Sequence, residues 1–307
     1  MAHLTLALLG PFQATVDGRT VTGFPTEKAR ALLAYLALGA DRPHPRATLA
    51  ALLWPEMPDE AAMSNLRKTL HRLRQALDAP APGLADRVVR ITRQTVQFDV
   101  TMCAVDATSV RALLEASAAH PHRQLARCVP CLERLAQAVA LYRGELLSGL
   151  ALADAPEFEE WLLLEREATL QQALRALSAL ADAETLRGAY EQARAYAARQ
   201  LALDPCREEA HRQAMRALAL AGQRSAALAQ YAACRRLLDE TLGVEPETRV
   251  CEKSGRAGSG DKEAEGLSGA GAEMLPEGGD LIGTGTPDEG EDEIAAGGHD
   301  LGGRAAA

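Results

Sequence analysis

Residues 59–78 read DEAAMSNLRKTLHRLRQALD, and this stretch decides how the rest of the chain is interpreted. Apolar residues recur in it at the spacing of an α-helix, and Pro58 followed by Asp59 marks its start, with Asp59 as the expected N-cap. The apolar stripe consists of Leu66, Leu70, Leu73 and Leu77. The opposite face consists of Ser64, Lys68, His71 and Gln75, flanked by Arg67, Arg72 and Arg74. Such a helix packs through its leucines and presents basic and amide groups, either to phosphates and base edges or to water.

Charge is distributed unevenly along the 307 residues, whose formal net charge is −9. Residues 1–100 carry 12 Lys and Arg against 9 Asp and Glu, residues 101–250 carry 17 against 20, and residues 251–307 carry 4 against 13. Seven basic residues and three acidic ones lie between positions 60 and 93. The net negative charge of the chain therefore comes from residues 251–307. It does not exclude a nucleic-acid partner for the basic segment between residues 60 and 93.

Several classes of protein are disfavoured by composition. No run of 18 apolar residues occurs, and the N-terminal MAHLTLALLG lacks the basic region and cleavage pattern of a signal peptide. Six cysteines in a chain of this length do not indicate a disulfide scaffold. We therefore expect a soluble, cytoplasmic protein with no membrane partner. No nucleophile elbow, strand-anchored Gly-rich loop or paired-carboxylate pattern is present, so we expect no enzymatic activity.

The segments before residue 59 follow strand patterns and then helix patterns. Leucines alternate over residues 3–9, as in a strand, and Asp-Gly at 17–18 is typical of a hairpin turn. Thr26 is placed to cap a helix that Gly39 ends, and a second short helix is expected over residues 46–54.

The segment after residue 78 predicts a loop and then a second hairpin, over residues 89–98. Arg87, Arg90 and Arg93 lie on or near this hairpin. Strands, three helices and a basic hairpin form, in this order, the winged-helix arrangement, in which a helix enters the major groove and the hairpin rests on the backbone or in the minor groove. The candidate DNA-binding residues are Ser64, Arg67, Lys68, His71, Arg72, Arg74, Gln75, Arg90 and Arg93.

Four ordered blocks between residues 4 and 99 resemble the antibiotic-regulatory-protein (SARP) family of bacterial activators: LLGPFQATVDGRTV, FPTEKARALLAYLAL, RATLAALLWP and NLRKTLHRLRQAL. The family's N-terminal domain is a winged helix of the OmpR/PhoB type. The resemblance implies that residues 60–77 are the recognition helix and that operators contain direct-repeat half-sites. It also implies that a loop contacts RNA polymerase, through Trp54, Glu56, Asp59 and Glu60. For Trp54 the alternative is packing in the core beside the adjacent leucines, which we favour.

From residue 105 to about 242 the periodicity is helical throughout. Six helices are expected, over residues 105–119, 131–142, 157–183, 188–203, 208–221 and 225–242. An offset of 34 residues, the tetratricopeptide period, aligns Gly188 with Gly222 and Ala193 with Ala227. The blocks LYRGELLSG, EFEEWLLLERE, ALALAGQRSAALAQYAACRRLL and LGVEPE resemble the bacterial transcriptional activator domain. This resemblance implies a role in dimerisation or in coupling to a partner.

Four residues with metal-binding side chains, in the pattern H-x-H-x5-C-x2-C, fall close together: His120, His122, Cys128 and Cys131. Zinc takes such nitrogen and sulfur ligands tetrahedrally, so a structural zinc ion is one interpretation. Against it, the two histidines are close in sequence and Pro121 limits how their imidazoles converge. Packing of the thiols in a loop between two helices is the simpler interpretation. A dithiol redox pair is the third, although the βαβ context typical of such pairs is missing.

After about residue 249 the composition changes, since residues 251–307 hold 15 of the 25 glycines and no Phe, Trp or Tyr. Such a segment cannot bury enough apolar surface to fold, so we predict disorder. No Walker-type G-x-x-x-x-G-K-[ST] occurs in the chain.

The sequence thus predicts an α+β winged helix over residues 1–100, an all-α tetratricopeptide-like repeat domain over residues 101–250 and a disordered tail over residues 251–307. The expected function is that of a transcriptional activator that binds double-stranded DNA and RNA polymerase, with a homodimer as a further expectation. Two alternatives are a repeat-based protein-interaction scaffold and a truncated fragment of a larger, ATPase-coupled regulator.

Overall fold

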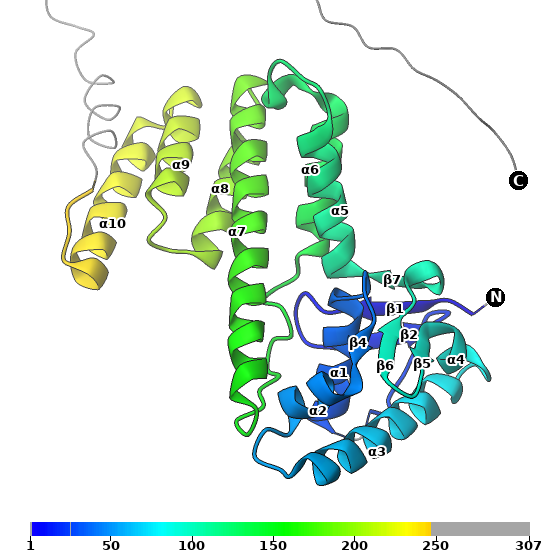
Figure 1. The fold of residues 1–307 in the computed structure, drawn as a ribbon. Coiled ribbons are helices and arrows are strands. Elements are labelled where there is room, and N and C mark those ends of the chain that lie inside the picture. The colour runs from blue at the N-terminus through cyan, green and yellow to red at the C-terminus, as the bar shows by residue number, and fades with distance from the viewer. Residues whose placement is uncertain (1, 25, 247–307) are drawn as a thin grey trace, which may run out of the picture. The chain divides into compact units, whose positions relative to one another are not determined.

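The computed structural model describes residues 2–24 and 26–246 (Figure 1). The N-terminal part contains strands β1 (Leu4–Ala7), β2 (Gln13–Val16), β3 (Arg19–Thr20), β4 (His44–Pro45), β5 (Val89–Ile91), β6 (Thr95–Phe98) and β7 (Cys103–Val105). Its helices are α1 (Glu27–Leu38), α2 (Arg46–Leu53), α3 (Asp59–Asp78), α4 (Leu84–Val88) and the 3-10 turn η1 (Val100–Met102). The strands form two small sheets, in the orders β3-β2-β1-β7 and β4-β6-β5.

Both predicted hairpins are present, and β7 adds a pairing that local patterns did not indicate. The turn between β2 and β3 places Asp17 at φ 47° and Gly18 at φ 78°, the positive values that an Asp-Gly hairpin turn needs. Strands β5 and β6 pair antiparallel, with Val89 opposite Phe98. Strand β7 pairs in parallel with β1, so the first sheet includes chain beyond residue 100.

The helix boundaries confirm most of the predicted helix starts and ends and correct one predicted N-cap. Thr26 accepts a hydrogen bond from the Ala29 N–H and caps α1, which Gly39 ends. Helix α3 spans residues 59–78 as predicted, but Asp59 is not its N-cap. The capping residue before the first turn is Pro58, and Asp59 already lies within that turn without a side-chain capping bond. Its carboxylate still lies at the positive end of the helix dipole.

The N-terminal part is held together by the leucine stripe of α3. Leu66, Leu70, Leu73 and Leu77 are at most 3 % exposed and pack in one hydrophobic core with leucines of β1, α1 and α2. The short helix α4 was not predicted, because a single turn after a proline- and glycine-rich loop leaves almost no periodic signal. It begins after Gly83, whose φ is 77°.

The C-terminal part of the described chain is helical. It contains α5 (Asp106–Ala119), η2 (Leu125–Arg127), α6 (Val129–Leu141), α7 (Pro156–Leu186), α8 (Tyr190–Leu203), α9 (Glu208–Leu220) and α10 (Arg224–Leu242). All six predicted helices are present. Gly188 and Gly222 both adopt a positive φ, of 79° and 77°, and each separates two successive helices. The 34-residue offset in sequence therefore corresponds to a repeat of backbone conformation.

A polar network is buried among three of these helices. The Gln213 side-chain amide of α9 donates to the carbonyl and hydroxyl oxygens of Ser178 at 3.1 and 2.9 Å and to Asp182 Oδ1 at 3.1 Å. Its own oxygen accepts a hydrogen bond of 2.8 Å from Gln200 of α8. Because the network links α7, α8 and α9, it fixes their register as well as their packing.

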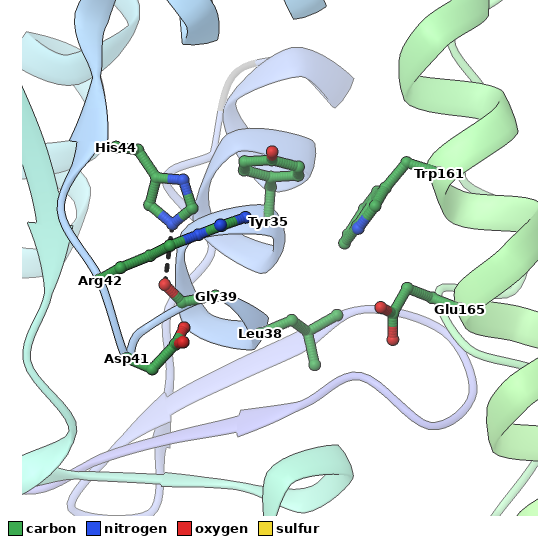
Figure 2. A pocket seen from close by; sticks show the side chains of 8 residues that line it. All are labelled: Tyr35, Leu38, Gly39, Asp41, Arg42, His44, Trp161 and Glu165. Carbon is green, nitrogen blue, oxygen red and sulfur yellow. Dashed lines mark hydrogen bonds between the residues drawn. The ribbon is translucent and has the colours of Figure 1, made fainter.

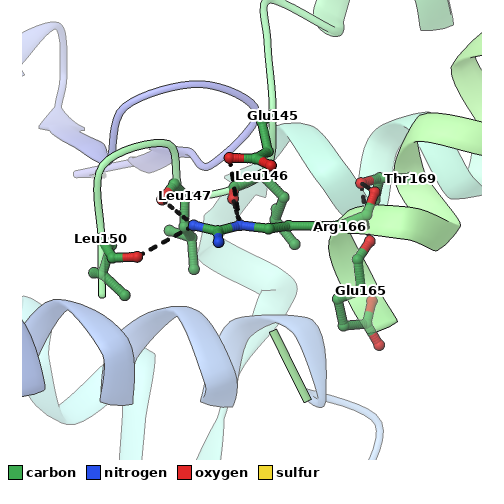
Figure 3. A network of polar contacts seen from close by, with 7 residues as sticks. All are labelled: Glu145, Leu146, Leu147, Leu150, Glu165, Arg166 and Thr169. Atoms are coloured by element: carbon green, nitrogen blue, oxygen red, sulfur yellow. Dashed lines mark hydrogen bonds and ion pairs between the residues drawn. The ribbon is translucent and has the colours of Figure 1, made fainter. Parts of the chain in front are cut away.

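The core of the N-terminal part continues into α5, α6 and α7, and the segment between α6 and α7 joins the two parts. A second hydrophobic cluster lies between α6 and α7. In this segment Leu146 bridges to Leu9 and Gly10, and the Leu147 N–H donates to the Leu8 carbonyl at 2.7 Å. Arg166 of α7 donates to three carbonyl oxygens of the same segment (Figure 3). The first residue of α5, Asp106, accepts hydrogen bonds from the N–H groups of residues 8 and 9 at 2.8 and 3.0 Å.

Two further predictions concern the C-terminal tail and membrane-spanning helices. The tail predicted to be disordered, residues 251–307, lies outside the described residues. Within the described residues, no helix combines the length and the apolar character needed to cross a membrane.

Candidate nucleic-acid interface

Helix α3 presents a polar face opposite its buried leucines. Arg67, Lys68, His71, Arg72 and Gln75 are exposed, and Ser64 and Arg74 are half-buried. Rotation of the helix about its axis would bring the leucines into water, at about 1.5–3 kcal/mol for each side chain. The hydrophobic core therefore fixes which side chains of α3 face outward.

Two of the candidate arginines are engaged in ion pairs. Arg74 pairs with Asp86 of α4, and Arg90 Nη2 lies 3.1 Å from Asp99 Oδ2. Hydrogen bonds from the hydroxyl and N–H of Thr101, with the Arg90 charge in addition, hold the pKa of Asp99 below its usual value. Asp99 is therefore ionised at neutral pH and remains a partner for Arg90.

The other basic candidates are Arg67, Lys68, Arg72 and Arg93. All four are exposed, and none makes a hydrogen bond or ion pair with another residue of the ranges 2–24 and 26–246. Unpaired cations on a rigid helix and on an adjacent hairpin are groups of the kind that bind a phosphate backbone.

The β5–β6 hairpin is held by both α2 and α3. Asp78, the last residue of α3, accepts a hydrogen bond from the Ala85 N–H at 2.9 Å and so positions α4, which leads directly into β5. The Arg46 N–H donates to the Gln94 carbonyl at 2.8 Å, and its guanidinium donates to the Thr92 carbonyl at 3.3 Å. Sequence reasoning did not single out Arg46, because its partners lie almost fifty residues away and leave no local signal.

The loop between α2 and α3 has a buried and an exposed part. Trp54 is 9 % exposed, and Lys28 Nζ lies 5.2 Å from the centre of its ring. Its side chain therefore packs in the core, which was the favoured alternative for this residue. Exposed acidic side chains follow it, at Glu56, Asp59 and Glu60. A pocket of about 420 Å³ lies between α2 and α3 at this loop.

A second pocket, of about 360 Å³, lies where α1 faces α7 (Figure 2). The rings of Tyr35 and Trp161, which line it, are in edge-to-face contact with centroids 4.7 Å apart. His44 Nε2 lies 2.8 Å from the Gly39 carbonyl and orders the end of α1. Glu165 at the other side is paired with Arg111 at 3.3 Å. His44 and Glu165 thus have partners within the protein, and we interpret the pocket as part of the contact between α1 and α7.

The four predicted metal-binding residues lie together in the structure. Their ligand atoms, on His120, His122, Cys128 and Cys131, are all within 4.8 Å of one another. No disulfide joins the two cysteines. Cys103, Cys206 and Cys234 are also free, and Cys251 lies outside the described residues.

Comparison with protein families and known proteins places this arrangement among bacterial regulators. Residues 105–254 match the bacterial transcriptional activator domain. The chain is 32 % identical over 276 residues to the regulatory protein AfsR of Streptomyces coelicolor, which covers 88 % of this chain and 26 % of AfsR. It is 30 % identical over 242 residues to the transcriptional regulator RedD of the same organism, covering 78 % of this chain and 66 % of RedD.

A mycobacterial regulator is similar in both sequence and structure. The chain is 29 % identical over 257 residues to the transcriptional regulatory protein EmbR of Mycobacterium tuberculosis, covering 80 % of this chain and 60 % of EmbR. The structure of EmbR in complex with a low-affinity phosphopeptide superimposes with a TM-score of 0.64 at 26 % identity, over 84 % of this chain and 65 % of that one. The chain thus spans between about a quarter and two thirds of the length of these relatives.

Proposed function

Because the chain belongs to the SARP-type family of bacterial transcriptional regulators, we propose that it binds double-stranded DNA through an N-terminal winged helix and activates transcription. In this proposal α3 is the recognition helix and the β5–β6 hairpin is the wing. The helical part provides self-association or contact with a partner, and the acidic residues of the α2–α3 loop and of the first turn of α3 contact RNA polymerase.

The observation that carries the proposal is the outward face of α3. Its exposed side chains include Arg67, Lys68 and Arg72, which are unpaired among the described residues, and the amide of Gln75. Cations supply sequence-independent affinity for phosphates, whereas Lys and Gln side chains can also bond base edges in the major groove. The leucine stripe supports this role because the leucines hold α3 in the core through the opposite face, which leaves the polar face free to contact DNA.

The ion pairs of the hairpin indicate which of its arginines are available to bind phosphates. Arg90 is occupied by Asp99, whereas Arg93 at the turn has no partner among the described residues. We therefore propose Arg93 as the main phosphate contact of the wing and Arg90 as a weaker one. By the same reasoning Arg74, paired with Asp86, contributes less than the unpaired Arg72.

Selection of bound sequences from a random duplex pool, followed by binding measurements over a range of salt concentrations, tests the proposal. The Lys68→Ala/His71→Ala variant should lose roughly tenfold to a hundredfold of its preference for the selected site over random DNA. Arg93→Ala should weaken binding to both duplexes alike and reduce the slope of log K against log salt by about 1. Arg175→Ala, an exposed arginine on α7, is the matched control and should change neither quantity.

A protein-interaction scaffold is the competing function. Leu163 and Leu164 of α7 are each 65 % exposed, which favours a protein partner for the helical part. If the wild-type chain prefers no duplex over random DNA, and the basic variants bind as it does, the winged-helix proposal fails and the scaffold remains.

A further inference from the structure

Four side chains with nitrogen and sulfur ligands converge where α5 is connected to α6. His120 follows the last turn of α5, Cys128 immediately precedes α6, and Cys131 lies in the first turn of α6. Cys131 Sγ lies 3.4 Å from Nδ1 of His120 and 3.8 Å from Nδ1 of His122. Cys128 Sγ lies 3.5 Å from the same nitrogen of His120. One atom from each residue can therefore face a common point.

These separations match the edges of a tetrahedral zinc site. Zinc–sulfur bonds of about 2.3 Å and zinc–nitrogen bonds of about 2.0–2.1 Å place neighbouring ligand atoms roughly 3.3–3.8 Å apart. The three distances of 3.4, 3.5 and 3.8 Å lie in this range, and the remaining ones do not exceed 4.8 Å. Small side-chain rotations would bring the four atoms to coordination distance of one ion.

The positions of the two imidazole rings answer the objection that Pro121 raised. Pro121 does not force the two imidazoles apart, because their rings stack with centroids 6.0 Å apart and an interplanar angle of 20°. Both rings direct Nδ1 towards Cys131. The closeness of the two histidines in the chain is therefore compatible with two ligands on one ion.

Inward packing of the thiols accounts for only part of the arrangement. Cys131 is fully buried and its thiol lies 3.7 Å from the Ser117 carbonyl, as a simple packed cysteine would. His122, however, is exposed and yet directs a nitrogen at the same sulfur, although it could be hydrated freely. An exposed imidazole aimed at a buried thiol is the geometry of a ligand rather than that of core packing.

We propose that His120, His122, Cys128 and Cys131 bind one zinc ion in a structural site. Four protein ligands leave no open position for a water or a substrate, so the ion joins secondary-structure elements rather than performing chemistry. Binding releases the two thiol protons and leaves a site with no net charge. The Arg134 guanidinium lies 3.9 Å from Cys131 Sγ and donates to the Ala116 carbonyl, so it borders the site as an outer partner.

The zinc ion would hold together the two ends of the segment that connects α5 and α6. Residues 120–128 contain only the single turn η2, and the zinc ion would tie both ends of this segment together. Helix α6 packs on α7 through Leu132 and Leu135, so an ordered start of α6 supports the helical part as a whole.

The full chain, purified under reducing conditions, provides the test. We expect about one equivalent of zinc by elemental mass spectrometry, and the absorption of tetrahedral thiolate-bound Co²⁺ after exchange. The Cys128→Ser/Cys131→Ser variant should retain less than about a tenth of an equivalent. Cys206→Ser, which changes a free cysteine elsewhere, is the matched control and should keep the full equivalent.

His122→Ala keeps the test decisive if the double cysteine variant does not fold, because this side chain is exposed. Loss of one ligand should weaken zinc binding by at least about tenfold, measured by competition with a chromophoric chelator. An unchanged affinity would overturn the four-ligand site. Wild-type protein with less than about a tenth of an equivalent of zinc and no Co²⁺ absorption at equimolar Co²⁺ would overturn zinc binding altogether.

Discussion

Replacement of Arg166 by alanine tests whether α7 holds the connecting segment through polar contacts or through leucine packing alone. The guanidinium donates to the carbonyl oxygens of Leu146, Leu147 and Leu150 at 2.9, 3.0 and 3.1 Å (Figure 3). Leu147 adopts a φ of 51°, a left-handed conformation that costs roughly 1–3 kcal/mol and persists only where the surroundings impose it. We expect Arg166 to supply much of that constraint.

The magnitude follows from the number and type of these bonds. A hydrogen bond from a charged donor contributes about 1.5–3 kcal/mol, but three bonds from one guanidinium are not independent. The Arg166 side chain is 20 % exposed, so water replaces part of what alanine removes. We expect Arg166→Ala to lower the free energy of unfolding by about 3–5 kcal/mol. Arg166→Lys should lose about half of that, because an ammonium cannot reproduce the planar fork of donors.

Thermal unfolding followed by circular dichroism, at fixed pH and protein concentration, measures this effect. A loss of 3–5 kcal/mol corresponds to a decrease in Tm of about 6–20 °C for a unit of this size. Arg175→Ala is the matched control, since Arg175 lies on the same helix, is exposed and pairs with none of the described residues. It should change stability by less than about 0.5 kcal/mol. A Tm for Arg166→Ala within 2 °C (roughly 1 kcal/mol) of the wild type would refute the reasoning, as would a lysine variant as stable as the parent.

Three further predictions concern other polar groups that are partly or fully buried. Asp106→Asn should lower the free energy of unfolding by about 2–3 kcal/mol, measured by urea denaturation, because an amide cannot accept both backbone hydrogen bonds from residues 8 and 9. Gln213→Ala should lower it by about 2–4 kcal/mol in the same assay, since it leaves a cavity and unpaired partners on α7 and α8, whereas an equal loss in the exposed Arg216→Ala would argue against this cause. Burial and the nearby Asp99 carboxylate raise the pKa of Cys103 to about 12. At pH 8 the alkylation of this thiol, followed by mass spectrometry, should therefore be at least about tenfold slower in the native chain than in the urea-unfolded chain. Equal rates in the two states would contradict a protonated native thiol.

The helices of this protein were largely predictable because their signals are local. The leucine spacing of residues 66–77, the Thr26 cap and the Gly39 end each depend on side chains within a turn or two of the backbone they order. The same holds for the six helices of the C-terminal part and for the two glycines 34 residues apart. The sequence by itself therefore determined the order of elements and the buried face of α3.

Pairings between distant segments were decided only by the tertiary structure. Strand β7 joins the first sheet through a parallel pairing with β1, about a hundred residues earlier, and three residues carry too little periodicity to reveal it. Arg74 and Arg90 looked equivalent to Arg72 and Arg93 until Asp86 and Asp99 were found beside the first two. The spacing of histidines and cysteines named four candidate ligands, but their convergence required α6 to return alongside α5. The identity of a side chain is given by the sequence, whereas the groups that lie next to it depend on how distant segments pack in the folded chain. Those neighbouring groups decide which arginines remain unpaired for DNA and which thiols lie close enough to share a metal ion.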